Sequence, residues 1–339
     1  MPDPEPLVSI ITPSYNQAQF LETTLRSVLE QDYPHIEYIV IDGGSTDGSV
    51  EILERYSDQL AYWESESDRG QADAINKGFK RATGEIVAWL NSDDVYTMGA
   101  IQQAVEALES NPEAGMVYGD GLMVDEDLRL LDPHTYPPLS VVDLLSFEVL
   151  LQPAVFMRRH ALEQVGYLND DFNLILDHEL WVRMASQFPI VHVPSFWALE
   201  RTHGEAKTIA LAGEFVTEAK QLLAWAQESD DLGETVQEHQ NRILAGYHVF
   251  AARRLIDAEA FSVAVRHLGK AMQYHPPTLL RYWYKAVQAG FSALGLSEAF
   301  MTYRRLRRRL QFGDVSVDPF SPLGEQPDLT RKIGKAAKQ

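Results

Sequence analysis

The sequence predicts an α/β fold, with a mixed and mostly parallel sheet covered by helices on both faces and followed by a helical C-terminal region. Short apolar runs alternate with segments of helical periodicity over residues 7–90, which is typical of parallel strands joined by helices. Strand patterns nearly vanish over residues 210–300, where alanine, leucine and aromatic residues recur at helical spacing. The chain has 339 residues, 45% of them hydrophobic, so it can bury a large core.

The first part of the chain contains four short runs rich in β-branched and aromatic residues that end at turn formers. These runs predict strands at residues 7–12, 36–41, 60–64 and 86–90. Apolar residues at helical spacing predict the helices between them, at residues 20–29, 49–56 and 71–82. In such sheets ligands bind beyond the carboxyl ends of the strands. We therefore expect a ligand site where polar residues follow the strands, at residues 12–16, 42–47 and 91–94.

The later elements are predicted from weaker patterns. They are a helix at 100–108, a strand at 116–118, a hairpin-like excursion at 120–136, a strand at 152–158 and a helix from 176. Residues 251–274 have the spacing of a tetratricopeptide-like helical hairpin, and one such unit cannot bury its faces alone. We favour helices that complete the fold over a partner-docking or dimerising appendage. Prolines and a lysine-rich end predict a flexible tail at 313–339.

Composition narrows the function. The net charge of -20 argues against nucleic acid as the main partner, because phosphate neutralisation needs a basic surface. The chain has no cysteine, which excludes disulfides, thiolate nucleophiles and zinc–thiolate sites. The N-terminus lacks the pattern of a signal peptide, and the least charged run, 184–199, is too short and too broken by proline to span a bilayer. These features predict a cytoplasmic protein.

One basic segment stands out from the acidic chain. Residues 303–312 place five arginines beside Leu306, Leu310 and Phe312. This pattern fits a peripheral contact with an anionic membrane surface, at its inner face, that carries a lipid-linked acceptor. It fits equally well a solvated face that pairs with the acidic body.

The strand at 86–90 runs directly into Asn91, Ser92, Asp93 and Asp94. Two adjacent carboxylates at the end of a buried strand are costly unless something compensates their charge. A divalent cation with a preference for oxygen ligands, Mg²⁺ or Mn²⁺, is one compensation. The alternative is a turn in which these side chains satisfy only local backbone groups, and this stretch alone leaves both interpretations open.

Two other loops are candidates for ligand contact. The loop at 43–48 is neither a P-loop nor a dinucleotide-binding loop, since neither spacing is present. Asp42 before it can accept hydrogen bonds from a base or a ribose, whereas Asp47 is expected to cap a helix. Asp68 and Gly70 precede a helix whose N-terminus could bind a diphosphate, with a simple N-cap at Asp68 as the alternative.

Four segments in order resemble the family 2 glycosyltransferases of the GT-A fold: Val-Ser-Ile-Ile-Thr-Pro-Ser-Tyr-Asn at 8–16, Ile-Asp-Gly-Gly-Ser-Thr-Asp-Gly at 41–48, residues 68–78, and Asn-Ser-Asp-Asp at 91–94. The resemblance covers about residues 6–210. It implies a nucleotide-diphosphate-sugar donor, with uridine as the expected base, a divalent metal, Mn²⁺ or Mg²⁺, and inverting transfer in a single displacement. The chain lacks the Gln-x-x-Arg-Trp segment of polymer-making relatives, so we expect a non-processive enzyme.

The resemblance also implies roles for individual residues. The expected substrate-binding residues are Thr12, Pro13, Tyr15, Asn16, Asp42, Asp68, Gly70, Gln71, Asn91, Ser92, Asp93, Gln152, Glu179, Trp181, Arg201 and Lys207. Asp94 is the expected metal ligand, followed by Asp93 and by His203. The pattern departs from a strict Asp-x-Asp because Ser92 separates Asn91 from the two acids.

Asp177 is the predicted general base, in a segment that resembles the acidic motif of the family. Inverting transfer needs a base to remove the proton of the acceptor hydroxyl. A helix N-cap is the alternative role for Asp177, and the two roles can coexist. In the loop at 201–208, Arg201 and Lys207 are expected to stabilise the leaving group.

The resemblance divides the chain into a GT-A domain at 1–210, with a donor-binding half at 6–119 and an acceptor half at 120–210, a helical region at 211–312 and the tail. The acceptor is expected to be a glycan, a lipid-linked or another hydroxyl compound, and the helical region could form a homodimer. Two alternatives are a non-catalytic sugar-nucleotide-binding scaffold and a nucleotidyltransferase. The latter would need a glycine-rich basic loop after the first strand, which 12–16 does not provide.

Overall fold

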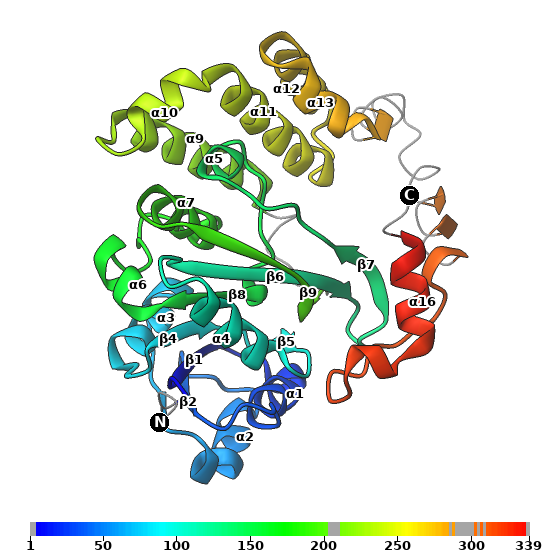
Figure 1. The fold of residues 1–339 in the computed structure, drawn as a ribbon. Coiled ribbons are helices and arrows are strands. Elements are labelled where there is room, and N and C mark those ends of the chain that lie inside the picture. The colour runs from blue at the N-terminus through cyan, green and yellow to red at the C-terminus, as the bar shows by residue number, and fades with distance from the viewer. Residues whose placement is uncertain are drawn as a thin grey trace.

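The computed structural model describes residues 5–202, 211–284 and 310–336, together with the pairs 287–288, 302–303 and 306–307. The described residues form a nine-stranded sheet with helices on both faces, and further helices from the C-terminal region cover one side (Figure 1). The strand order is β3-β2-β1-β4-β8-β6-β9-β5, with β7 paired to β6. The predicted α/β fold with a helical C-terminal region is confirmed.

The first half of the sheet is parallel throughout. Its strands are β1 (Val8–Ser14), β2 (Ile36–Asp42), β3 (Tyr62–Ser65) and β4 (Ile86–Trp89). The helices that join them are α1 (Ala18–Leu29), α2 (Ser49–Tyr56) and α3 (Gln71–Arg81). Ser14 pairs with Asp42, and Asp42 pairs with Ser65. This register brings the carboxyl ends of three strands to one edge, as the sequence predicted.

The second half of the sheet mixes parallel and antiparallel pairs. Its strands are β5 (Val95–Tyr96), β6 (Met116–Val124), β7 (Leu130–His134), β8 (Val155–Arg158) and β9 (Ile190–Arg201). Its helices are α4 (Ala100–Ser110), α5 (Val141–Leu145), α6 (Arg159–Val165) and α7 (Leu176–Gln187). Strand β8 lies between β4 and β6 and is antiparallel to both, so it is a central strand of the sheet.

Strand β9 is the longest strand, and the sequence pattern did not predict it. Pro194 is unusual within a central strand, because proline cannot donate a hydrogen bond to the ladder. The structure accommodates Pro194 at an irregularity, where the register jumps from Val193 to Phe196. After this irregularity β9 continues parallel to β6 and ends at Glu200 and Arg201.

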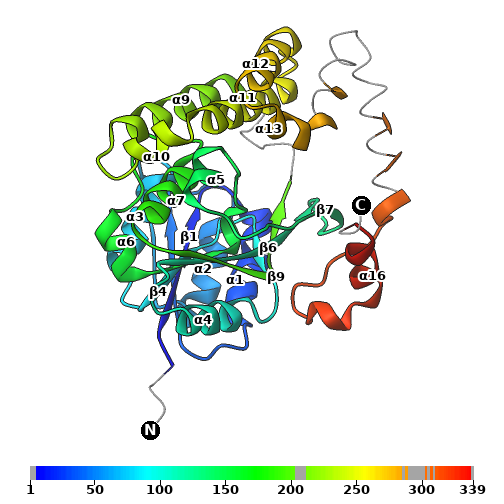
Figure 2. The same ribbon diagram turned by 45° about the horizontal axis from the view of Figure 1, so that its top comes forward.

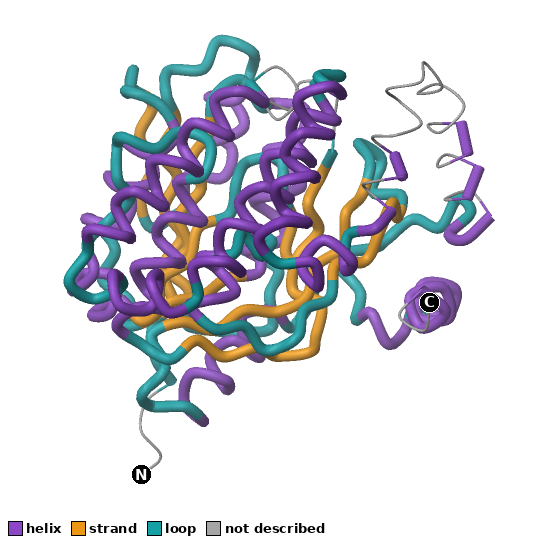
Figure 3. Tube along the Cα trace, turned by 90° about the horizontal axis from the view of Figure 1, so that it is seen from above, coloured by secondary structure: helices purple, strands orange, loops and turns teal. Residues whose placement is uncertain are grey.

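The C-terminal helices share a core with the sheet domain. They are α9 (Ala212–Glu228), α10 (Gly233–Glu238), α11 (Gln240–Asp257), α12 (Phe261–Tyr274) and α13 (Pro276–Arg281). Figures 2 and 3 show α9 and α11 lying over the layer that contains α5 and α7. Phe215, Leu222 and Phe250 belong to the same buried cluster as Trp89 and Trp181. This shared core favours the interpretation that the helices complete the fold, while their roles in docking or dimerisation stay predictions.

The end of the chain differs from the predicted flexible tail wherever it is described. Phe312, Val317 and Leu329 are buried with Leu122 and Leu199 of the sheet. Backbone hydrogen bonds run from Leu130 N to Val315 O at 2.9 Å and from Val317 N to Leu128 O at 2.9 Å. The described part of the tail contains a short 3₁₀ turn (Leu323–Glu325) and α16 (Pro327–Ala336). Apolar residues spaced through the proline-rich sequence therefore cover the edge of the sheet near β7 (Figure 1).

Four of the five arginines of the predicted membrane-contact segment, at 304, 305, 308 and 309, lie outside the described residues. Within 5–202, 211–284 and the other described residues, no helix is long and apolar enough to cross a membrane.

Candidate active site

The carboxylate of Asp42 shapes the loop that follows β2. Its side chain is fully buried and accepts hydrogen bonds from Gly44 N at 3.1 Å, Ser45 N at 2.8 Å and Ser45 Oγ at 2.6 Å. Ser65 Oγ donates a fourth at 2.7 Å. These hydrogen bonds show that Asp42 holds the loop in its conformation, while the direct ligand contact expected for it stays a prediction.

Asn16 braces the same loop from the end of β1. Its backbone N–H donates to Ser45 Oγ at 2.8 Å, and its Oδ1 accepts from Thr46 N at 2.9 Å. Asp47 accepts hydrogen bonds from Ala18 N and Ser49 N, at the first residues of α1 and α2, which is the predicted capping role. These bonds tie the loops after β1 and β2 into one unit.

Tyr15 and Asp68 lie on either side of Gly43. A Cβ added to Gly43 would lie 2.8 Å from Asp68 Oδ2 and 3.3 Å from Tyr15 Cδ2, so a larger residue here would displace the Asp68 carboxylate. The Tyr15 ring is 63% exposed, and Asp68 Oδ1 accepts from Gly70 N at 2.8 Å. An exposed aromatic ring beside a carboxylate is suited to stacking on a base while accepting a ribose hydroxyl.

Thr12 and Pro13 are buried behind this edge. Thr12 Oγ1 lies 2.9 Å from the Tyr38 hydroxyl, so its hydrogen bond stays inside the core. Pro13 is also buried and pairs with Ile41 across β1 and β2. The structure thus gives these two residues of the predicted nucleoside pocket a supporting position behind Tyr15.

An amide network links α3, β4 and the segment before β8. Gln71 Nε2 donates to Asn91 Oδ1 at 2.8 Å, and Asn91 Nδ2 donates to Gln152 Oε1 at 3.0 Å and to Asp94 Oδ2 at 3.2 Å. Gln152 Nε2 in turn donates to Trp89 O at 2.8 Å. Four predicted site residues from three segments therefore meet in one network, which fixes the orientation of the Asp94 carboxyl group.

Asp94 and Arg201 form the second part of this network. Asp94 is 4% exposed, and its Oδ1 accepts from Arg201 N at 3.0 Å. Burial raises the pKa of the Asp94 carboxyl group well above its ordinary value, and the nearby charges of Asp93 and Glu200 raise it further. Ser92 holds the turn through its carbonyl, which accepts from Thr24 Oγ1 at 3.0 Å.

The guanidinium group of Arg201 covers the acidic turn. It donates to Asp93 O at 2.9 Å and lies over the Phe20 ring at 4.4 Å. Its Nε is buried and has no hydrogen-bond partner among the described residues. Burial lowers the pKa of Arg201, while Asp94 and Asp93 oppose this shift. A phosphate oxygen beside the turn would satisfy this donor.

This acidic turn suits a divalent cation. The pKa of Asp94 is raised partly because adjacent carboxylates lack a compensating charge, and oxygen ligands match the preference of Mg²⁺ and Mn²⁺. Across the described ranges, no group of three or more His, Asp or Glu side chains is placed to hold a metal by itself. The expected ligand His203, like Lys207, lies outside the described residues.

Asp177 lies in the first turn of α7, where Ile175 is the N-cap residue, so the N-cap alternative is wrong. Its Oδ1 accepts from His178 N at 2.7 Å. Burial raises the pKa of Asp177 to about 6, against hydrogen bonding to His178 and the charge of Arg254, which lower it. An acid with this pKa is partly ionised near neutral pH and can accept a proton.

Glu200 and Arg254 are functional candidates that the sequence did not reveal. Burial raises the pKa of Glu200 to about 7, and the charges of Asp177 and Asp93 raise it as well, whereas Arg254 lowers it. Arg254 comes from α11, with its guanidinium 4.3 Å from the centre of the Phe215 ring. Its charge interacts with both Asp177 and Glu200. The helical region therefore contributes a cation to the acidic site.

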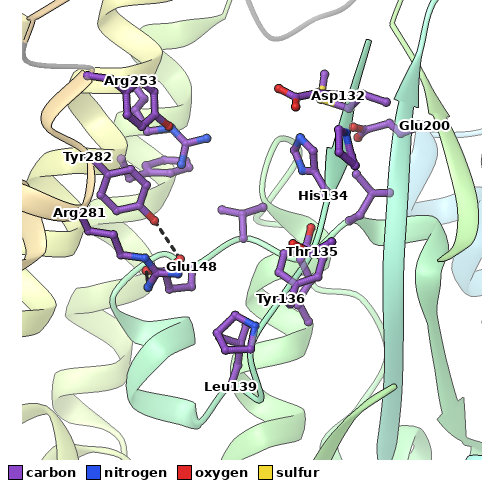
Figure 4. A pocket seen from close by; sticks show the side chains of 18 of the residues that line it. Asp132, His134, Thr135, Tyr136, Leu139, Glu148, Glu200, Arg253, Arg281 and Tyr282 are labelled. Carbon is purple, nitrogen blue, oxygen red and sulfur yellow. Dashed lines mark hydrogen bonds and ion pairs between the residues drawn. The ribbon is translucent and has the colours of Figure 1, made fainter. Parts of the chain in front are cut away.

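Glu200 and Arg254 also line a cavity of about 470 Å³ between the sheet and the C-terminal helices. Figure 4 shows Arg253 and Tyr282 on the helical side, facing Asp132, His134 and Glu200 on the side of the strands. The loop at 148–151 closes part of the floor. The cavity is large enough for a sugar-sized group.

Two predicted substrate-binding residues of α7 have structural roles instead. Glu179 is 2% exposed, and its two oxygens accept from Arg183 Nε and Nη2 at 2.7 Å each. Trp181 is fully buried and stacks on Trp89, with ring centres 5.2 Å apart. Both side chains are buried and packed against other core residues, so the predicted substrate contact of Glu179 and Trp181 is contradicted by their burial.

We expect Glu179→Gln to lower the free energy of unfolding by about 3 kcal/mol, because it breaks a buried ion pair. The same change at Glu163, whose carboxylate is 45% exposed in its pair with Arg159, is the matched control and should cost less than about 0.5 kcal/mol. Urea denaturation measures both. A large rise in KM for a substrate with unchanged stability of Glu179→Gln would restore the substrate-binding role.

The sequence is similar to a family of known proteins. The model of glycosyl transferase family 2 matches residues 9–166. A glycosyltransferase of Mycobacterium tuberculosis without an assigned activity, Rv1514c, is 36% identical over 184 residues, which are 53% of this chain and 69% of that protein. A similar protein of Rickettsia conorii is 30% identical over 214 residues, 59% of this chain. The chain covers 34% of the length of the Rickettsia protein.

A solved structure shares the fold over nearly the whole chain. The mannosyltransferase PcManGT of Pyrobaculum calidifontis, solved with GDP-Man and Mn²⁺, aligns with 99% of this chain and 88% of its own chain, at a TM-score of 0.60 and 21% identity. The sheet and its helices therefore have the GT-A-type fold. The chain belongs to glycosyltransferase family 2, which confirms the predicted enzyme class.

Proposed function

We propose that this glycosyltransferase is inverting, and that it moves a sugar from a nucleotide-diphosphate-sugar to an acceptor hydroxyl with Asp177 as general base. The observation that supports the proposal is the half-buried side chain of Asp177, whose pKa is raised to about 6. The charge of Asp177 also raises the pKa of Glu200, which lies beside the acidic turn that contains Asp94. A base near neutral pKa, close to a donor site, is what a single displacement requires. The donor half is proposed at 6–119 and the acceptor half at 120–210.

In the proposed donor site, Tyr15 and Asp68 hold the nucleoside, and Asp93, Asn91 and Arg201 hold the sugar diphosphate. The support is the exposed ring of Tyr15 beside Asp68, and the buried Nε of Arg201 above the acidic turn. A UDP-sugar is the expected donor. The mannosyltransferase with the same fold was solved with GDP-Man, so both bases belong in any test.

The proposed reaction breaks one bond and forms one. The acceptor oxygen attacks the anomeric carbon, the bond from that carbon to the diphosphate oxygen breaks, and the nucleotide diphosphate leaves with both electrons of the bond. Asp177 takes the proton of the acceptor hydroxyl. Arg201 stabilises the charge that develops on the leaving diphosphate. The positive charge of Arg254 reduces the repulsion between Asp177 and Glu200 when both carboxylates are ionised.

Asp94, with Asp93 beside it, is the proposed place for Mn²⁺ or Mg²⁺. When bound there, the ion would supply positive charge to the diphosphate. The hydrogen bonds from Asn91 and Arg201 N orient the Asp94 carboxylate for this task. The acceptor is proposed to be a glycan or lipid-linked compound in polysaccharide biosynthesis. Peripheral contact with the inner face of the membrane through 303–312 and dimerisation through the helical region remain parts of the proposal.

A thermal-shift screen of UDP- and GDP-sugars with Mn²⁺, followed by assay of nucleotide release, tests the proposal. A ligand at 100 times its dissociation constant should stabilise the protein by about 2.7 kcal/mol. We expect one nucleotide-sugar to raise the unfolding temperature and to be hydrolysed slowly without an acceptor. Nucleotide binding with neither hydrolysis nor transfer to any acceptor would favour the scaffold alternative.

The raised pKa of Asp177 predicts how stability depends on pH. The folded state favours the protonated acid, since the pKa rises from 3.8 to about 6. Ionised Asp177 therefore destabilises the folded protein. This effect is absent at pH values below the pKa of the unfolded state, grows as pH rises, and is complete above the pKa of the folded state. Asp177→Asn should therefore stabilise the protein, by about 1 kcal/mol more at pH 8 than at pH 5. Urea denaturation at the two pH values measures this difference, and an equal effect at both would contradict the raised pKa.

A further inference from the structure

The cavity beside Glu200 contains an arginine whose charge has no acidic partner within hydrogen-bonding distance. Among the described residues, the guanidinium group of Arg253 makes no hydrogen bond or ion pair. The Cζ atom of Arg253 lies 5.6 Å from the centre of the Tyr282 ring. Figure 4 shows the Arg253 side chain on the wall of the cavity. A guanidinium group in this position keeps its donors available for a ligand.

The other two arginines that line the cavity both act on carboxylates. Arg281 Nη1 donates to Glu148 Oε1 at 2.7 Å, and Tyr282 donates to Glu148 Oε2 at 2.8 Å. The charge of Arg254 acts on Asp177 and Glu200. Arg253 is therefore the cation of this wall that remains for an incoming group.

The surroundings of Arg253 favour a compact anion over a second protein side chain. The cavity of about 470 Å³ has the size of a sugar residue rather than of a protein interface. The guanidinium group of Arg253 lies 5.6 Å from the centre of the Tyr282 ring, within the range of a cation–π contact, which leaves its N–H donors available. Planar guanidinium groups bind carboxylates and phosphates with two parallel hydrogen bonds.

We propose that the acceptor of this enzyme carries an anionic group, a carboxylate or a phosphate, that binds Arg253 in this cavity. The inference rests on the proposed function, because it assigns the cavity to the acceptor. Glu200 lies on the opposite wall and would repel an anion that binds on its own side. The charge pattern therefore orients the acceptor, with its anionic group toward α11 and the rest of the molecule toward Glu200.

Binding of small acceptor analogues tests the proposal without any need for turnover. The protein is first saturated with the nucleotide diphosphate found in the screen and Mn²⁺, so that the donor site is filled. Calorimetry then measures binding of glucuronate, which carries a carboxylate, and glycerol phosphate, which carries a phosphate. Glucose and glycerol are the neutral analogues. We expect one anionic compound to bind more tightly than its neutral analogue by about tenfold or more.

Substitutions assign the effect to the side chain. Arg253→Gln should remove the preference for the anion, and Arg253→Lys should keep part of it because the charge remains. Arg55→Gln is the matched control, since Arg55 is an exposed arginine on α2 that pairs with Glu22. Slow hydrolysis of the donor should persist in all three variants, which separates this test from the proposed function. Equal binding of charged and neutral compounds to the wild type, or an unchanged preference in Arg253→Gln, would overturn the proposal.

Discussion

Asp177→Asn is expected to lower kcat for sugar transfer by about 10²- to 10⁴-fold while leaving the affinity for the donor nearly unchanged. The amide has the shape of the carboxyl group but cannot accept the proton of the acceptor hydroxyl. The hydrogen bond from His178 N to Oδ1 can persist in the variant, so the start of α7 should stay intact. Nucleotide release in the presence of acceptor measures the rate, and thermal shift measures donor binding.

Two further variants sharpen this test. Asp58→Asn changes an exposed acid in the turn after α2 and should leave the rate unchanged. Glu200→Gln should have a smaller effect than Asp177→Asn, because Glu200 is proposed to act on the base and on the orientation of the acceptor. A complete loss of activity in Glu200→Gln, with activity retained in Asp177→Asn, would transfer the role of base to Glu200.

The second large effect is expected at Asp94. Asp94→Asn should reduce donor turnover on the order of a hundredfold or more, because it removes a buried carboxylate from the side of the leaving diphosphate. In the wild type, Arg201 N and Asn91 Nδ2 each donate a hydrogen bond to one carboxylate oxygen of Asp94. In the variant, the NH₂ group of the new amide would face one of these donors and lose that hydrogen bond. Hydrolysis of the donor over a range of Mn²⁺ concentrations measures the effect.

Asp120→Asn is the matched control for Asp94→Asn. Asp120 is another buried acid of the sheet, and its Oδ1 accepts hydrogen bonds from His192 Nε2 at 2.8 Å and from Tyr136 N at 3.0 Å. This control should lose stability but keep the wild-type dependence on Mn²⁺. If chelation of the metal and Asp94→Asn both leave donor turnover unchanged, the metal assignment is wrong.

Local patterns predicted the first half of the fold well. Helix α2 spans Ser49–Tyr56, the predicted residues, and the strands differ from their predicted ends by only one or two residues. The reason is that apolar runs and turn formers alternate cleanly there, so propensity and burial agree. The sheet edge followed from this order, which is why Asn91 and Asp94 were predicted at the same edge as Tyr15.

The pattern was less informative where tertiary contacts override it. Strand β9 was missed because Pro194 sits at an irregularity that no local rule predicts, and its last residues Glu200 and Arg201 were therefore not placed on a strand. Arg254 lies within a helix and gives no local sign of its charge partners. Glu179 could have been assigned correctly, because Arg183 follows it by four residues and such a pair lies on one helix face.

The tail shows the same effect of tertiary packing. Its prolines and charges are typical of a flexible segment, yet Val317 and Leu329, together with Phe312 just before the tail, cover apolar residues of β6 and β9. These three side chains are too far apart in sequence to form a periodic pattern. Their burial depends on the apolar edge of the sheet that they cover, and this edge cannot be predicted from the sequence of the tail alone.

The anomeric configuration of the first-formed sugar tests the central claim most directly. The enzyme is incubated with Mn²⁺ and an α-linked nucleotide-sugar that the screen identifies, and proton NMR follows the sugar released before it equilibrates in water. A single displacement assisted by Asp177 predicts that the β-anomer appears first, and that Asp177→Asn abolishes its formation. Initial release of the α-anomer would contradict the account.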